Sequence, residues 1–370
     1  MACNTAAFFA LLRAGLWETE VRLGQFKDVD YAVVYRISEE QSVVGVVAAG
    51  MDHVTDVKIP KDDVLTFAGM ALQLEQRNLA MNRFVEGLTK RMNSEGIYSL
   101  LLKGQGIAQC YGRPLWRSAG DVDLFLDSDN YQKAETLLIP IAQNIREENP
   151  YTIHKAMTIS PWEVEIHGTL RSELGKQIDR ELDSIQNGIF KEGRVRVWKN
   201  GDSDVNLPAA NEDVVYVFTH ILQHFFMGGI GLRQVCDWCR LLYTYRNSLD
   251  YELLEQRNRN MGLMSEWCAF AALAVDSLGM PVESMPLYSP SRKWSRKASR
   301  IVSIILETGN FGYNRDKSYY FKSPFVIRKI ISFAQNTGDS IRHFCIFPKD
   351  SSRVWWKRLG KGVSAALKGK

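Results

Sequence analysis

Two aspartates near the middle of the chain have the spacing of metal ligands. In Gly120-Asp121-Val122-Asp123-Leu124 the two carboxylates stand at positions i and i+2. On a β-strand such side chains point to one face, while their neighbours point to the other. Two converging carboxylates repel each other unless a cation lies between them. Mg²⁺ is the natural cation, because it binds one or two carboxylates and completes its coordination with water and substrate phosphates.

A second acidic strand is predicted about 40 residues later. The run WEVEIH at 162–167 alternates apolar and polar residues and follows Ser160-Pro161, so we expect it to form the second arm of a hairpin. If this arm lies beside the aspartate strand, Glu163 or Glu165 becomes the third carboxylate of a two-metal site. That carboxylate could bind the catalytic metal or accept the proton of an attacking hydroxyl.

A strand that ends in a glycine turn precedes the aspartates. The run LLLKGQG at 100–106 predicts a strand, then a turn that opens a helix at about Ile107. Backbone N–H groups at this helix start, with the Lys103 ammonium, suit a triphosphate. Arg117, four residues before Asp121, carries a planar fork that can hold a phosphate through two hydrogen bonds. Each motif is weak alone, and their order along the chain predicts a site for a metal and a nucleoside triphosphate.

The string LLLKGQGIAQCYGRPLWRSAGDVDLFL at 100–126, followed by WEVEIHGTL at 162–170, resembles a known family. It is similar to the uncharacterised bacterial nucleotidyltransferase family of the polymerase-beta-like superfamily, whose pattern is KG, then R, then GDxDL, then an acidic residue before a xH pair. The specific match covers roughly residues 95–170. The wider superfamily usually has Gly-Ser where this chain has Lys103-Gly104, so the serine contact to the γ-phosphate is missing.

The resemblance implies a role for six residues. It implies that the metal ligands are Asp121, Asp123 and Glu165, and that the nucleotide-phosphate contacts are Lys103, Gly104 and Arg117. Glu165 is preferred to Glu163 because it directly precedes Ile166-His167, as the family pattern requires. The implied cofactor is a pair of Mg²⁺ ions, with an NTP as substrate.

Four histidines are candidates for contact with an acceptor or for support of the site. His154 and His167 belong to the predicted hairpin, where either a site role or a structural hydrogen bond is expected. His220 and His224 stand at i and i+4 on one predicted helix. The glutamate of a zinc-protease motif is absent beside them, so packing or acceptor contact is favoured over metal ligation.

Two further pairs lie on the next predicted helix. Cys236 and Cys239 form a CxxC without a second copy, which favours core thiols over a metal or redox site. Arg233 and Asp237 stand at i and i+4 and are expected to form a helix ion pair or to touch substrate.

The elements around these motifs predict an α+β fold with a small mixed sheet. Strands are predicted at 99–102, 122–126, 152–159, 162–168 and 195–198, and a helix at 130–144 capped by Ser128 or Asp129. Helices are predicted before them at 62–92 and, from an ambiguous Val-rich run, at 31–47. Later helices are predicted at 211–227 with Asn211 as cap, 232–245, 251–260, 263–278, 293–306, 325–344 and 352–367.

The order of these elements suggests four parts. We expect an N-terminal helical region (1–95), a nucleotidyltransferase-like α+β domain (96–208), a helical domain (209–290) and a basic helical tail (291–370). The tail holds 18 Lys and Arg against 4 Asp and Glu, whereas the first 290 residues hold 28 against 38. The tail therefore either binds an anionic partner, such as nucleic acid, a membrane surface or a glycan precursor, or packs against the acidic remainder of the chain.

Cysteine usage and hydropathy predict the compartment. Six cysteines are scattered along 370 residues, and the start lacks the pattern of a signal peptide. The apolar run at 6–17 is shorter than the roughly 20 residues of a membrane helix, so we expect no transmembrane segment. These features predict reduced thiols and a cytoplasmic location, with the tail as a means of peripheral membrane association.

Together the motifs predict an enzyme that moves a nucleoside monophosphate from an NTP to a hydroxyl or phosphate of an acceptor. Members of the resembled family commonly occur beside bacterial surface-polysaccharide genes, which associates the acceptor with polysaccharide metabolism. A protein or an antibiotic is a second kind of acceptor to consider. The alternative from another class is a non-catalytic nucleotide-binding scaffold that docks on a membrane or glycan-assembly complex through its basic tail. The complete carboxylate set argues against a scaffold, which has no need of three metal-facing acids.

Overall fold

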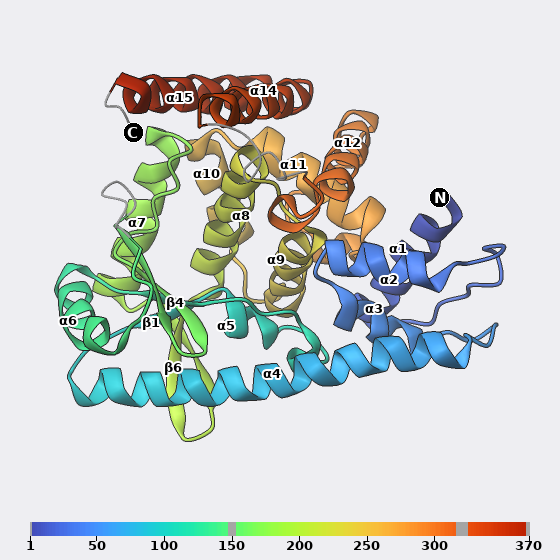
Figure 1. Cartoon of the computed structure of the whole chain (residues 1–370), viewed down its shortest axis with the longest axis horizontal. Coiled ribbons are helices and arrows are strands. Elements are labelled where there is room, and N and C mark those ends of the chain that lie inside the picture. Colours follow the sequence, from blue (N-terminus) through green and yellow to red (C-terminus); the bar gives the residue numbers. More distant parts are fainter. Residues whose placement is uncertain (1, 147–152, 316–324, 368–370) are drawn as a thin grey trace.

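The computed structural model describes residues 2–146, 153–315 and 325–367 (Figure 1). Its centre is one mixed sheet of six strands in the order β3-β4-β2-β1-β6-β5, with helices on the N-terminal and C-terminal sides of the chain. The strands are β1 (Leu100–Leu102), β2 (Val122–Phe125), β3 (His154–Ile159), β4 (Trp162–His167), β5 (Val195–Asn200) and β6 (Ser203–Pro208). The predicted α+β class with a small mixed sheet is confirmed.

Strand β2 brings the acidic motifs together. It pairs antiparallel with β1 and parallel with β4, and its register places Asp123 opposite Glu165. Val122 and Leu124 are buried in the core beneath the sheet, as the alternation of the sequence predicts. The predicted hairpin is β3 and β4, in which His154 lies opposite His167. The start of the predicted first arm, at 152, lies outside the described residues.

Four helices precede the sheet: α1 (Ala2–Trp17), α2 (Tyr31–Glu40), α3 (Val44–Met51) and α4 (Lys61–Ser94). Helix α4 has 34 residues and runs along the lower side of the molecule, past both the other N-terminal helices and the sheet (Figure 1). The ambiguous Val-rich run is helical but forms two helices, with Ser42 between them at φ +56°. Helices α1 and α3 touch closely, because a Cβ on Gly50 would stand 2.0 Å from the carbonyl oxygen of Leu11.

The helices from Lys176 onward contribute most residues of the larger apolar cluster. They are α7 (Lys176–Glu192), α8 (Ala210–Met227), α9 (Leu232–Tyr245), α10 (Tyr251–Met261), α11 (Met264–Ala272), α12 (Arg292–Thr308), α14 (Phe325–Phe344) and α15 (Pro348–Leu367), with α7 between β4 and β5. Phe218 of α8 packs against Trp238 of α9 and Trp267 of α11, with ring centroids 5.1 and 4.9 Å away. Helix α8 is therefore held rigidly over the sheet.

Three local predictions need correction. The helix expected at 130–144 is α6 (Ser128–Leu138), its cap is Asp127, and a 3₁₀ turn containing Pro140 follows it, because proline cannot continue the helical hydrogen bonds. Helix α8 begins at Ala210 without a side-chain cap, and Asn211 instead accepts a hydrogen bond from the backbone of Asp250. The end of the helix expected at 263–278 is a π-helical turn, Leu273–Ser277.

Two elements were not predicted. Helix α7 buries Ile178, Leu182, Ile185 and Ile189, whose spacing of three and four residues is typical of an amphipathic helix. Strand β6 contains Asp204 and Asn206, and these polar residues obscure its strand pattern.

Cys236 and Cys239 are both fully buried and free, as predicted for core thiols. Within the described residues, no helix is long and apolar enough to cross a membrane.

A buried carboxyl pair joins α11 to α15 and makes stability depend on pH. Glu266, which is 2% exposed, lies against Asp350. Burial and the Asp350 charge, opposed more weakly by Lys297, raise the pKa of Glu266 from 4.5 to about 8. Between these values the folded protein keeps a proton that the unfolded chain has released, so stability falls as pH rises through this window.

We expect the free energy of unfolding of the wild type to fall between pH 6 and pH 9 in urea titrations, by up to a few kcal/mol. Glu266→Gln should lack most of this fall, because its amide cannot ionise. Glu255→Gln, at an exposed pair with Arg259 on α10, serves as the control and should follow the wild type. Parallel profiles for wild type and Glu266→Gln would show that Glu266 is ionised at neutral pH.

Candidate active site

Three carboxylates converge where β2 meets β4. Oxygen atoms of Asp121, Asp123 and Glu165 all lie within 4.8 Å of one another. Asp123 is 2% exposed, and Asp121 is exposed at the start of the strand. The parallel pairing of β2 with β4 explains this meeting, because it sets Asp123 beside Glu165 in the register. The donors are carboxylate oxygens, which fits a hard cation such as Mg²⁺.

Asp121 and Asp123 lie in different electrostatic surroundings, which shift their pKa values in opposite directions. Burial disfavours the charged form of Asp123, but Lys103 Nζ at 3.1 Å and His167 Nε2 at 2.8 Å from its Oδ1 outweigh burial, and its pKa lies well below the ordinary value. The Asp123 charge, together with burial, raises the pKa of Asp121. The two carboxylates thus repel each other, and a divalent cation between them would relieve that repulsion.

Glu165, and not Glu163, faces this cluster. Burial disfavours its charge, but the hydrogen bond from His154, at 3.0 Å between Nε2 and Oε2, lowers its pKa. Its Oε2 lies 3.7 Å from His167 Nε2, and the His154 and His167 rings stack at 4.9 Å. Glu163 lies on the same face of β4, but it accepts hydrogen bonds from Thr158 and Arg146 and does not belong to the carboxylate group.

Lys103 stands at the turn between β1 and α5 (Gly104–Ala108) with a φ of +50°, a strained conformation for a non-glycine residue. Its ammonium bridges Asp123 and His220, with 3.0 Å between Nζ and His220 Nε2. Burial opposes its charge, but Asp123 and the other nearby acids raise its pKa. The turn thus holds a cation permanently beside the carboxylate cluster.

Arg117 is buried and paired with α9. Its Nε and Nη2 donate to the two carboxylate oxygens of Asp237 at 2.9 and 2.7 Å, and Tyr111 donates to the same carboxylate. Asp237 therefore pairs with Arg117 instead of forming the expected helix pair with Arg233. Arg233 donates from Nη1 to the carbonyl oxygen of Ser118 at 2.9 Å. Among the described residues, two buried nitrogens here, Arg117 Nη1 and Arg233 Nε, have no hydrogen-bond partner.

A cavity of about 400 Å³ opens in front of these groups. Its lining contains the three carboxylates and three arginines, Arg117, Arg146 and Arg233, together with Lys103 and Gly104. The structure thus brings all six residues implied by the resemblance to one cavity, whose opposed charges suit a metal and the anionic phosphates that it binds.

His220 and His224 also line this cavity. Their Nε2 atoms are 3.1 Å apart. Burial and the Lys103 charge lower the pKa of both rings, that of His224 to about 4, so both are neutral at physiological pH. Within the described residues, neither histidine belongs to a group of side chains that could hold a metal ion. His220 contacts Lys103 directly, and His224 contacts His220.

Converging carboxylates on neighbouring strands of a mixed sheet, in a cavity that arginines also line, suit an enzyme that transfers nucleotides. The chain matches the family described as uncharacterised nucleotidyltransferase over residues 27–279, and it belongs to this family. No curated protein and no solved structure matches it. The match supports a transferase role and, with the acidic group, use of an NTP and a divalent metal.

Sequence reasoning did not find several residues of the site. Arg146 and Gln234 line the cavity, and the pairing of Arg117 with Asp237 depends on the contact of α9 with the loop before β2. The sequence did contain one indication for Asp237, because an acid on the apolar face of a helix is expected to have a charged partner. The identity of that partner depends on tertiary contacts, 120 residues apart in the chain.

Proposed function

We propose that this protein is a Mg²⁺-dependent nucleotidyltransferase that moves a nucleoside monophosphate from an NTP to an acceptor hydroxyl or phosphate and releases pyrophosphate. The observation that carries the proposal is the meeting of three carboxylates in one cavity with two guanidinium groups, each of which has a buried nitrogen without a hydrogen-bond partner among the described residues. The family resemblance suggests surface-polysaccharide metabolism as the setting in which acceptors should be sought.

Each group has a chemical role in this proposal. Asp121, Asp123 and Glu165 hold Mg²⁺, which when bound neutralises phosphate charge in the transition state. Lys103, Gly104 and Arg117 face the triphosphate, with Arg233 beside them. Asp237 orients Arg117 so that Nη1 remains available to a phosphate oxygen. These contacts align the α-phosphorus for attack in line with the departing pyrophosphate.

Pyrophosphate release tests this function. The protein is incubated with each of the four NTPs, with Mg²⁺ or with EDTA. We expect slow release with water as acceptor, in the presence of Mg²⁺ alone and with a preference for one base. Binding of Mg·NTP without release from any of the four would favour the non-catalytic scaffold instead.

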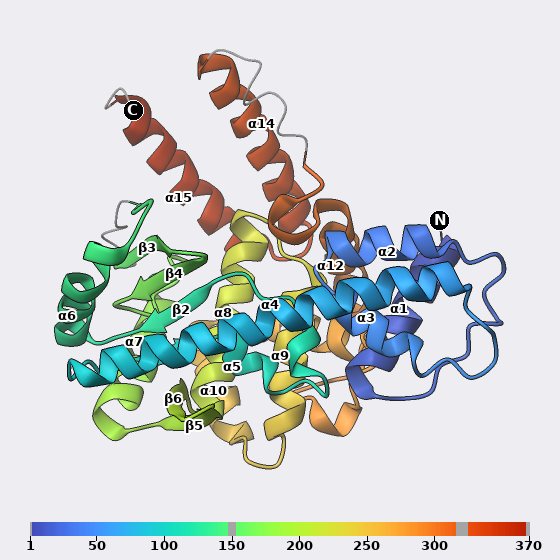
Figure 2. The same cartoon turned by 60° about the horizontal axis from the view of Figure 1, so that its bottom comes forward.

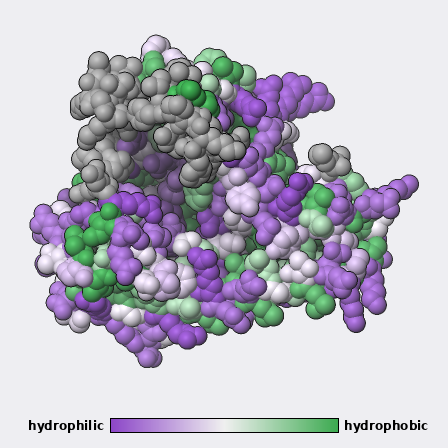
Figure 3. Space-filling model, viewed as in Figure 1, coloured by the Kyte–Doolittle hydropathy of each residue, from purple (hydrophilic) through white to green (hydrophobic). Residues whose placement is uncertain are grey.

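The scaffold alternative, and peripheral membrane association, depend on the tail. Helices α14 and α15 extend from the body (Figure 2), and apolar side chains appear near the top of the molecule, where these helices lie (Figure 3). Ile341, Phe344 and Trp356 are 62%, 51% and 65% exposed. Among the ion pairs of the described residues, Lys357–Glu173 is the one that joins a tail cation to an acid before residue 291. Exposed apolar side chains on a basic tail favour an anionic membrane surface as its occupant.

We expect the protein to sediment with vesicles that contain anionic phosphatidylserine and not with neutral phosphatidylcholine vesicles. Trp356→Ser should weaken this sedimentation several-fold, because it removes exposed apolar area, while the exposed but remote Leu65→Ser should not. Equal sedimentation with both lipids, or with neither, would contradict membrane docking.

A further inference from the structure

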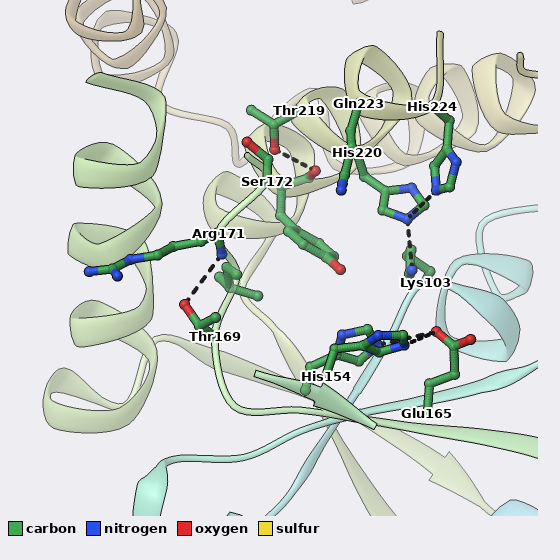
Figure 4. A pocket seen from close by; sticks show the side chains of 13 residues that line it. Lys103, His154, Glu165, Thr169, Arg171, Ser172, Thr219, His220, Gln223 and His224 are labelled. Atoms are coloured by element: carbon green, nitrogen blue, oxygen red, sulfur yellow. Dashed lines mark hydrogen bonds and ion pairs between the residues drawn. The ribbon is translucent and has the colours of Figure 1, made fainter. Parts of the chain in front are cut away.

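A second cavity of about 240 Å³ adjoins the first (Figure 4). Its floor is the β3–β4 hairpin with His154, Glu165 and His167, and its roof is α8. The two cavities share four lining residues, which are Lys103, Glu165, His220 and His224. Glu165 thus lines both the larger cavity, proposed for the triphosphate, and the smaller cavity, to which the proposed function assigns no ligand.

The two cavities differ in charge. Of the three arginines in the larger one, Arg146 pairs with Glu163, while Arg117 and Arg233 each keep a buried nitrogen without a hydrogen-bond partner among the described residues. The smaller one carries Arg171, but its guanidinium points away (Figure 4) and donates two hydrogen bonds of 2.8 Å to Asp183 on α7. Lys103 also lines the larger cavity, where the proposed function assigns it to the triphosphate. A phosphate in the smaller cavity would therefore lie beside the Glu165 carboxylate with no cation of its own, which is unfavourable.

Most of the remaining side chains of the smaller cavity carry neutral hydrogen-bonding groups. Gln223 extends from α8 into the cavity (Figure 4). The hydroxyl of Tyr216 stays protonated, because burial raises its pKa to about 12. The hydroxyls of Thr169, Ser172 and Thr219 and the imidazoles of His220 and His224 also line the cavity. Such donors and acceptors match the hydroxyls of a carbohydrate.

We propose that the smaller cavity binds the acceptor, an inference that rests on the proposed function. The acceptor presents a neutral polyhydroxyl group, a sugar or polyol, rather than a phosphate. The cavity is smaller than the roughly 300–1,000 Å³ of drug and cofactor sites, so it holds one small unit. The acceptor oxygen forms a bond to the α-phosphorus as the bond from that phosphorus to the pyrophosphate oxygen breaks. The hydroxyl proton passes to Glu165, which His154 orients.

Matched acceptors test this inference. Pyrophosphate release is measured with the NTP and Mg²⁺ in the presence of glucose, N-acetylglucosamine or glycerol, and of glucose 6-phosphate, N-acetylglucosamine 6-phosphate or glycerol 3-phosphate. We expect at least one neutral compound to raise release about tenfold above the water rate and to gain the nucleoside monophosphate by mass spectrometry. The inference is overturned if a phosphorylated partner is the faster acceptor. It is also overturned if no neutral compound raises release while Mg·NTP still binds, an outcome that leaves the proposed nucleotide site intact.

A variant of the cavity gives a second readout. Gln223→Leu should raise the KM for the best neutral acceptor about tenfold, with kcat and the thermal shift by Mg·NTP retained, because it removes hydrogen bonds to the acceptor alone. Gln132→Leu, at an exposed position of α6, is the matched control and should behave as the wild type. An unchanged KM in Gln223→Leu would place the acceptor elsewhere.

Discussion

Asp123→Asn should lose Mg²⁺-dependent pyrophosphate release by at least about a hundredfold. Removal of a residue that only supports a metal ligand lowers metal affinity or activity about 10–100-fold. Asp123 is proposed as a ligand itself, so its loss should cost more. It is the most buried of the three carboxylates, and Lys103 and His167 hold it in position. The amide keeps the shape of the side chain and removes its charge, so binding of the cation should suffer more than folding.

The control for this prediction is Asp204→Asn, which removes an exposed carboxylate from β6 of the same sheet. We expect its pyrophosphate release to stay within about twofold of the wild type, since no contact of Asp204 reaches the cavity. Activity of Asp123→Asn within a few-fold of the wild type, in a protein with an unchanged circular dichroism spectrum, would remove Asp123 from the metal site.

Asp237→Asn should be the most destabilising single change near the site. The side chains of Arg117 and Asp237 are only 5% and 7% exposed, so the amide leaves the guanidinium charge buried without a counter-charge. Breaking such a buried pair costs about 3–5 kcal/mol. Urea unfolding measures the loss, and activity should fall as well, because Arg117 is no longer oriented toward the phosphates.

Asp183→Asn provides a matched comparison. Asp183 also accepts two hydrogen bonds from one arginine, Arg171, but these side chains are 34% and 45% exposed. Water solvates the charges of an exposed pair, and its loss costs about 0–1 kcal/mol. If the two variants lose similar stability, burial does not govern the Arg117–Asp237 pair.

Much of the site could be predicted because its carboxylates lie on strands with a regular pattern. Alternation in DVDLF and WEVEIH fixes which side chains share a face, and the hairpin follows from Ser160-Pro161. What the pattern cannot give is the order of strands. The parallel pairing of β2 with β4 joins segments about 40 residues apart, and the resemblance rather than the alternation favoured Glu165 over Glu163.

Other features depend on contacts that a local pattern does not contain. Arg117 was predicted to bind phosphate with its fork, yet two of its nitrogens donate to Asp237. The second cavity is formed by α8 above the β3–β4 hairpin, and its neutral lining comes from three separate segments. The position of α8 is set by aromatic packing among distant helices, which no short stretch of sequence encodes.

The most direct test of the nucleotide site is thermal unfolding of the wild type and of Asp123→Asn with each NTP, with and without Mg²⁺. A ligand at about 100 times its Kd stabilises the folded state by about 2.7 kcal/mol, which raises the Tm by several degrees. We predict a rise that requires Mg²⁺, favours one base and occurs in the wild type alone. No rise with any NTP in the folded wild type, or an equal rise in Asp123→Asn, would contradict the assignment of the carboxylate cluster to metal and nucleotide binding.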